Sequence, residues 1–305
     1  MCREARETGP RVKTAVVLMA YGSPERPEDI PAYFADIRGG RPVRPEAVAE
    51  LTERYRRIGG RSPLNEITEA QRVALERELG MPVHVGMKHW RPRIAQAAQR
   101  AVAGGARRVV GLVLAPHYSR MSIGGYRERL EEALPEGVEL TFIDSWHDHE
   151  PFLDVVAERV RGSDAHVVFT AHSLPERILA GGDPYREQLL ETSRLVADRA
   201  GVDSWSFAFQ SESPTGEPWL GPDILDELEA LHARGVEKVL VAPVGFVSDH
   251  LEILWDIDVE AREKAADLGL ELDRTESLND DAAFIRALAE LVEKASAAPA
   301  RIGAG

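Results

Sequence analysis

The feature that most constrains this chain is a regular alternation of short apolar runs with longer amphipathic stretches. The apolar runs have the length of strands and cover 15–20, 82–86, 108–115, 138–143, 166–171, 205–209, 237–244 and 269–273. The amphipathic stretches predict helices over 46–57, 66–79, 91–104, 124–134, 151–161, 185–200, 222–234, 251–267 and 280–295. Apolar strands that alternate with helices are typical of parallel sheets covered on both faces, so we expect an α/β fold.

The chain also resembles itself. Residues 16–25 and 167–176 are each an apolar run ending in alanine, then an aromatic ring and a turn with Pro-Glu. Residues 105–109 and 235–239 share a helix stop before a strand, at a different offset. We therefore expect two Rossmann-like lobes, over 1–145 and 146–305, with the last helix packed back on the first lobe. Chance similarity between α/β units is the alternative.

The repeat predicts where a ligand binds. Open parallel sheets bind ligands beyond the carboxyl ends of their strands. The internal alignment pairs Tyr21 with His172, and each follows an apolar run. We expect these two rings to face each other across a cleft between the lobes.

The charge of the chain limits its partners. The formal charge is −14, which argues against binding to nucleic acid or to anionic lipid. An anionic ligand would need a local cationic patch, and arginines bind carboxylates well because the guanidinium is a planar fork. The candidate patch consists of Arg38, Arg41, Arg54, Tyr55, Arg56, Arg57, Arg61 and Ser62. An ordinary basic helix surface is the alternative.

The cysteine content and the N-terminal residues point to a compartment. Cys2 is the single cysteine, so we expect neither an intrachain disulfide nor an iron–sulfur cluster. The first fourteen residues are charged and lack an apolar core, so we expect no secretory signal. The apolar runs are too short to span a membrane. These observations predict a soluble cytoplasmic protein without integral membrane association.

The clearest candidate for chemistry is the segment 243–252 and the helix that follows it. The apolar run breaks at Gly245, and Glu252, Asp256 and Glu260 then recur every four residues along one helix face. Like charges at this spacing repel. A row of oxygen ligands for a divalent cation, or a proton relay, would explain them. A solvated acidic face is the alternative.

The histidines give one further candidate for the active site and one decoy, a run that only looks like a metal site. His172 follows the most apolar run of the second half, and an imidazole can bind a transition metal or take up a proton near neutral pH. The run His147-Asp148-His149-Glu150 looks like a metal site, but neighbouring side chains in a loop seldom converge on one ion. The phosphate-binding patterns GxGxxG and GxxxxGK[ST] do not occur, which argues against nucleotide chemistry.

Taken together, these residues resemble the ferrochelatases, which insert ferrous iron into a porphyrin, along nearly the whole chain. The matching stretches are 19–22, 54–55, 58–63, 114–117, 171–175, 219–223 and 245–252. The resemblance implies the chelatase fold, with a porphyrin cleft between two lobes. The tyrosine of Met19-Ala20-Tyr21-Gly22 and the short C-terminus are most similar to the bacterial coproporphyrin III ferrochelatases.

The resemblance also assigns roles to residues. His172 and Glu252 match the pair at the metal-insertion centre, and which of them is base and which is iron ligand stays open. Tyr21 matches the residue that can approach the product iron from the other face, and Asp256 and Glu260 match a relay toward solvent. The positions that match porphyrin contacts are Tyr21, Arg38, Arg54, Tyr55, Ser62 and Tyr126. Gly39 departs from relatives that have a second arginine there.

The implied reaction is insertion of Fe²⁺ into coproporphyrin III with release of two protons, a lyase step of haem biosynthesis. Protoporphyrin IX as substrate is one alternative. A cobalt or nickel chelatase for sirohydrochlorin-type rings and a non-catalytic porphyrin or haem carrier are less favoured. Iron is then a substrate, and no permanent cofactor is expected. The expected partners are the porphyrin, Fe²⁺ and, by transient handover, neighbouring enzymes of the haem pathway. The chain is expected to be a monomer.

Overall fold

The computed structural model describes residues 13–213 and 215–297, and Cys2 lies outside this part of the chain. Its strands form two parallel sheets of four strands each. The first contains β1 (Thr14–Ala20), β2 (Val83–Met87), β3 (Arg108–Val113) and β4 (Glu139–Ile143), in the order β2-β1-β3-β4. The second contains β5 (His166–His172), β6 (Trp205–Gln210), β7 (Lys238–Ala242) and β8 (Glu271–Arg274), in the order β6-β5-β7-β8.

The two sheets therefore have the same strand order, which agrees with the internal repeat of the sequence. In each sheet the second strand along the chain pairs with one side of the first strand, and the third strand pairs with its other side. The point of reversal lies between β1 and β3 in one sheet and between β5 and β7 in the other. Ligands of such sheets bind at this point, beyond the carboxyl ends of the strands.

All the strands expected from the apolar runs are present, within a few residues of the expected bounds. The helices are α1 (Ile30–Ile37), α2 (Pro45–Arg57), α3 (Leu64–Leu79), α4 (Ile94–Ala103), α5 (Gly125–Ala133), α6 (Glu150–Val160), α7 (Arg177–Ala180), α8 (Tyr185–Ala200), α9 (Ile224–Ala233), α10 (Arg262–Leu268) and α11 (Ala282–Ala297). The sequence did not predict α1 and α7, which are too short to show a helical period.

Two stretches of the chain are π-helical, at Arg120–Gly124 and Ile253–Ala261. The second occupies most of the region where an ordinary helix over 251–267 was expected. Apolar periodicity does not separate a wide helix from a regular one. Wide turns of this kind occur frequently at functional sites.

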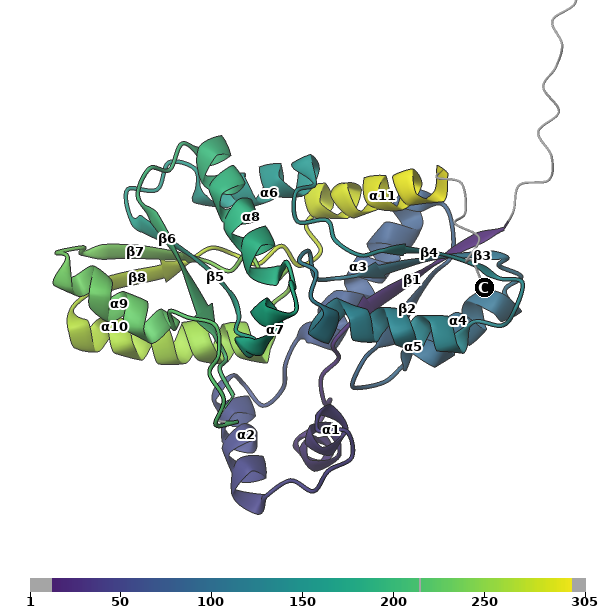
Figure 1. Cartoon of the computed structure of the whole chain (residues 1–305), viewed down its shortest axis with the longest axis horizontal. Helices are drawn as coiled ribbons and strands as arrows, with labels where there is room; N and C mark the ends of the chain where they lie inside the picture. The colour runs from purple at the N-terminus through teal and green to yellow at the C-terminus, as the bar shows by residue number, and fades with distance from the viewer. Residues whose placement is uncertain (1–12, 214, 298–305) are drawn as a thin grey trace, which may run out of the picture.

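The lobes are joined by a continuous apolar core. Strand β1 is buried from Ala15 onward, and its Val16 and Leu18 belong to the same cluster of buried side chains as Phe169 of β5. Helix α11 packs on α3, β3 and β4 as well as on α6, so the C-terminal helix lies against the first lobe (Figure 1). Trp146 contacts Phe284 of α11 with ring centroids 6.1 Å apart. This shared core holds the two sheets, and the loops that follow their strands, at a fixed separation.

Helices α1 and α2 project from one side of the two sheets (Figure 1). Arg57, in the last turn of α2, reaches α10 of the other lobe and forms an ion pair with Glu263 at 2.6 Å. The projecting α2 therefore contacts both lobes at the mouth of the space between them. Among the residues described, no helix combines the length and the apolar character needed to cross a membrane.

Candidate active site

A cleft opens between the lobes at the point where the strand order of each sheet reverses. Its walls come from the loops after β1, β3, β5 and β7, together with residues of α2 and α5. The space inside these walls, counted out to open solvent, is about 1190 Å³. Predicted site residues that line it are Tyr21, Tyr55, Ser62, Tyr126, His172 and Glu252.

His172 and Glu252 meet on the wall formed by the second lobe. His172 is the last residue of β5, and Glu252 directly precedes the π-helical stretch that follows β7. The distance from His172 Nδ1 to Glu252 Oε2 is 3.1 Å, and each side chain is about one third exposed to the cleft. The Tyr185 hydroxyl donates to the main-chain oxygen of His172 at 3.0 Å, which fixes the end of β5.

The two side chains alter each other's protonation. Burial by itself would lower the pKa of His172, but the charge and hydrogen bond of Glu252 reverse this and raise the pKa above its usual value. Burial would raise the pKa of Glu252, but His172 and then His250 hold it well below its usual value. The contact therefore favours the imidazolium form of His172 and the carboxylate form of Glu252.

Gly245 allows the loop after β7 to approach β5 closely. Its amide donates to Thr170 O at 3.0 Å, and a Cβ at this position would lie 2.4 Å from the Cβ of Ala171. No residue larger than glycine fits without a shift of one of the two main chains. The glycine that breaks the apolar run thus brings the segment leading to Glu252 next to the strand that ends in His172.

The carboxylate row extends from Glu252 into the protein. Asp256 is only 6% exposed, accepts a hydrogen bond from the Ser211 hydroxyl, and lies 3.4 Å from Gln210 Nε2. The same Gln210 nitrogen donates to the main-chain oxygen of Glu252. Burial and the neighbouring Glu252 carboxylate raise the pKa of Asp256 to about 7. Asp256 therefore exchanges its proton near neutral pH, which suits a relay.

Glu260, the last member of the row, is half-buried and does not line the cleft. Across the described part of the chain, no three His, Cys, Asp or Glu side chains are arranged together as ligands of one metal ion.

Tyr21 lies on the opposite wall, after β1, as the internal repeat predicted. Its side chain is 40% exposed, and its ring lies against His89 with centroids 4.6 Å apart. The surrounding protein, followed by the charge of Glu252, raises the pKa of Tyr21 well above its usual value. The free enzyme therefore presents a neutral phenol to the cleft.

The other predicted contacts divide into residues inside the cleft and residues at its rim. Tyr55 and Tyr126 are buried in the wall, and the Tyr55 hydroxyl contacts Ser23 at 3.0 Å. Arg54 is not part of the lining but stands above the Trp255 ring of the π-helical stretch, 5.5 Å from its centroid. Arg38, at the end of α1, is exposed and also lies outside the lining.

The decoy histidines do not converge. His147 contacts Glu191 of α8 at 3.0 Å, whereas His149 contacts the main chain of α11 at 3.1 Å. Both side chains join elements of the fold and do not form a metal site with each other.

Sequence reasoning missed several residues of the site. His250 lies within the segment already singled out, and its Nε2 is 3.7 Å from Glu252 Oε2, so its place after β7 was an available signal. Gln210 is likewise the last residue of a strand, β6, and Ser211 follows it. Tyr185 and Trp255 lie in helices, and their spacing alone gave no indication of the cleft.

Comparison with known proteins decides the family. The sequence profile described as "Ferrochelatase" matches residues 13–296. The chain belongs to the ferrochelatase family. It is 44% identical over 299 residues to a protein of Herpetosiphon aurantiacus named "Ferrochelatase", covering 92% of this chain and 98% of that protein. It is 42% identical over 303 residues to the "Coproporphyrin III ferrochelatase" of Geobacillus kaustophilus, covering 92% and 96%.

As a ferrochelatase, this chain is an enzyme that inserts iron into a porphyrin. The solved structures agree on the fold. The sirohydrochlorin chelatase SirB from Bacillus subtilis subspecies spizizenii, in complex with cobalt, has a TM-score of 0.60 and 12% identity, covering 93% of this chain and 95% of that chain. The expected chelatase fold is thereby confirmed.

Proposed function

We propose that this ferrochelatase metallates coproporphyrin III, a porphyrin with four propionates. Two of the relatives described above bear the names "Ferrochelatase" and "Coproporphyrin III ferrochelatase", so the names leave the porphyrin open. The observation that carries the proposal is the placement of two cations beside the cleft, outside its lining. Arg54 stands at the mouth beside Trp255, and Lys88 stands 4.7 Å from the centre of the Tyr126 ring in the wall.

The reaction requires that two pyrrole N–H protons leave the ring while Fe²⁺ loses its water and enters. In the free enzyme the contact with Glu252 favours the protonated form of His172, and an imidazolium can neither accept a proton nor bind a metal. Of the two side chains, the Glu252 carboxylate has lone pairs that can accept a proton, and it lines the cleft. We therefore assign the first proton acceptance to Glu252, and to His172 the role of holding that carboxylate charged.

Protons accepted at Glu252 need a way out, and Asp256 is suited to receive them because its pKa lies near 7. Gln210 bridges the two residues by donating to Glu252 O and toward Asp256 Oδ2. Binding of the peripheral propionates can supply energy that holds the ring in a bent geometry, with its nitrogen lone pairs out of plane. Iron is a substrate in this scheme, which needs no permanent cofactor.

The test compares two porphyrins with the wild-type enzyme under anaerobic conditions. Purified protein is mixed with Fe²⁺ and either coproporphyrin III or protoporphyrin IX, and metallation is followed by absorption. We expect a higher kcat/KM with coproporphyrin III, and a falling advantage as salt increases, because exposed charge pairs are screened. A higher kcat/KM with protoporphyrin IX would overturn the substrate assignment while leaving the family assignment intact.

A further inference from the structure

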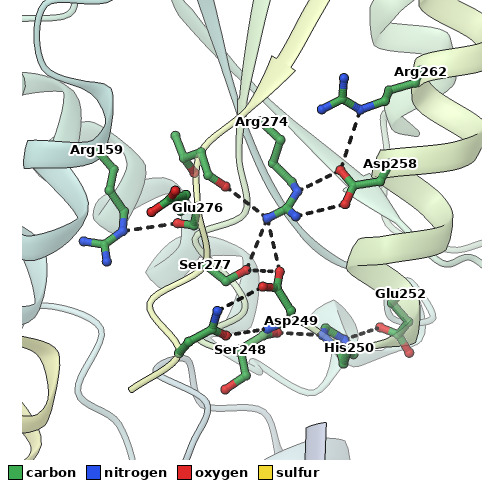
Figure 2. A network of polar contacts seen from close by, with 12 residues as sticks. Arg159, Ser248, Asp249, His250, Glu252, Asp258, Arg262, Arg274, Glu276 and Ser277 are labelled. Carbon is green, nitrogen blue, oxygen red and sulfur yellow. Dashed lines mark hydrogen bonds and ion pairs between the residues drawn. The ribbon is translucent and has the colours of Figure 1, made fainter. Parts of the chain in front are cut away.

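The helix that carries Glu252 contains more carboxylates than the row uses. Between residues 249 and 260 the chain has five acidic side chains, Asp249, Glu252, Asp256, Asp258 and Glu260. Three of them form the row described above. The remaining two, Asp249 and Asp258, both contact Arg274 at the end of β8, and Asp258 also lies 3.8 Å from Arg262 Nε (Figure 2).

The contacts of Arg274 are specific and mostly buried. Its Nε and Nη2 donate to the two carboxylate oxygens of Asp258, each at 2.9 Å, which is the bidentate arrangement typical of strong arginine–carboxylate pairs. Its Nη1 lies 3.3 Å from Asp249 Oδ1. The Arg274 side chain is only 12% exposed, so solvent screens these interactions far less than it screens surface ion pairs.

Asp249 in turn organises the segment that precedes Glu252. It accepts hydrogen bonds from Ser277 Oγ at 2.7 Å and Asn279 Nδ2 at 2.9 Å. The next residue, His250, donates from Nδ1 to Ser248 O, and this leaves its Nε2 directed at Glu252 (Figure 2). Arg274 is thus linked to Glu252 in three steps: it contacts Asp249, Asp249 precedes His250 in the chain, and His250 lies next to the Glu252 carboxylate.

Asp249 and Asp258 also flank Glu252 along the chain. One lies before the π-helical stretch and the other within it, so a single guanidinium fixes the segment on both sides of Glu252. Without that cation, and among the residues described, Asp258 would keep only Arg262, whose Nε lies 3.8 Å from its Oδ1, and Asp249 would keep only its hydrogen bonds from Ser277 and Asn279. Loss of the cation from a partly buried ion pair is destabilising, because the carboxylate charge is then less well compensated. The oxygens of Asp249 and Asp258 would also be less occupied by hydrogen-bond donors and so more available to Fe²⁺.

We propose that Arg274 is a positioning residue for metal insertion: by binding Asp249 and Asp258, it fixes Glu252 at the cleft and keeps these two carboxylates unavailable to the incoming Fe²⁺. This inference rests on the assignment of proton acceptance to Glu252. It does not depend on which porphyrin is the substrate, because it concerns the use of the metal.

The test is a set of variants of the full chain assayed with whichever porphyrin the wild-type enzyme prefers. For Arg274→Met we expect kcat/KM for Fe²⁺ to fall about tenfold or more, as loss of outer-shell support does at metal sites, while KM for the porphyrin stays within about twofold. Arg274→Lys keeps the charge but loses the bidentate fork, so it should restore part of kcat/KM. Asp258→Asn, a nearly isosteric change, should lower the same parameter less than Arg274→Met does.

Arg159 provides the matched control. It is 19% exposed, lies in α6, and binds Glu276 O and Asp281 on the chain segment that follows Arg274, without contact to the π-helical stretch (Figure 2). Arg159→Met should lower Tm but leave kcat/KM for Fe²⁺ unchanged. The proposal is overturned if Arg274→Lys and Asp258→Asn keep the wild-type kcat/KM for Fe²⁺, even where Arg274→Met fails to fold. It is also overturned if Arg159→Met lowers this parameter as much as the Arg274 variants do.

Discussion

His172 and Glu252 stabilise each other's charged form through one contact of 3.1 Å between Nδ1 and Oε2. Burial alone would favour the neutral form of both groups, and the pairing reverses this preference on each side. The proton acceptor of the proposed reaction, Glu252, is thereby kept in its charged form, and His250 contributes to the same effect.

The first prediction concerns the acceptor. Glu252→Gln preserves the size of the side chain but removes the carboxylate, so we expect the rate of metallation to fall by about 10²–10⁴, the usual cost of losing a general base. The pKa of His172 should fall as well, because the negative charge of Glu252 that raises it is no longer present. Anaerobic absorption assays give the rate, and NMR titration of the imidazole gives the pKa.

Circular dichroism and thermal unfolding must show that the Glu252→Gln variant is folded. A folded variant with near wild-type turnover would exclude Glu252 from the mechanism.

The second prediction uses the raised pKa of Asp256. The folded protein holds a proton on Asp256 up to a pH of about 7, whereas the unfolded chain releases it near 4. Asp256 therefore makes the wild-type protein less stable as pH rises through this window. Asp256→Asn lacks the titration, so its free energy of unfolding should exceed that of the wild type by at most about 4 kcal/mol at pH 7.5 and by much less at pH 4.5.

Urea unfolding at the two pH values measures this difference. Asp203 is exposed, so Asp203→Asn is the matched control and should change stability little at either pH. An equal gain for Asp256→Asn at pH 4.5 and pH 7.5 would contradict the titration argument. The same variant should also metallate more slowly, because an amide cannot relay a proton.

The sequence predicted the parts of this molecule that depend on period and on strand ends. The apolar runs identified every strand of the described residues. The repeat placed Tyr21 and His172 on facing walls, since each lies at the carboxyl end of the first strand of a sheet. Residues 253–261 were expected to form part of an ordinary helix, because the spacing of apolar residues does not distinguish a π-helix from an α-helix.

Contacts between elements remote in sequence were not predictable in the same way. Arg274 lies 16 residues after Asp258, and only the pairing of β8 with β7 brings its guanidinium to the helix. Tyr185 reaches His172 O from a helix of its own. Arg54 and Arg38 show the converse: both carry the expected charge, yet one stands at the rim of the cleft and the other is exposed beyond its lining.

The third prediction concerns the cation at the rim. Arg54→Ala should raise KM for coproporphyrin III more than it lowers kcat, and the effect should shrink as salt increases, because it removes a partner of a propionate. Arg194→Ala is the matched control: Arg194 also forms an ion pair with a residue four positions away, but on α8. Equal effects of the two variants on KM would show that Arg54 does not bind the porphyrin.

The last prediction concerns Tyr21, whose position was expected from the repeat. Tyr21 and His172 line the cleft from opposite lobes, so a porphyrin metallated on the His172 side presents its other face to the phenol. A phenolate can bind ferric iron, and coordination lowers the pKa of a ligand, which would overcome the raised pKa of the free side chain. Tyr21→Phe removes the oxygen but keeps the ring against His89. Metallation should therefore continue at a similar or reduced rate, while the absorption spectrum of the bound ferric product should change. An unchanged product spectrum in a folded Tyr21→Phe variant would show that Tyr21 contributes only packing at the end of β1.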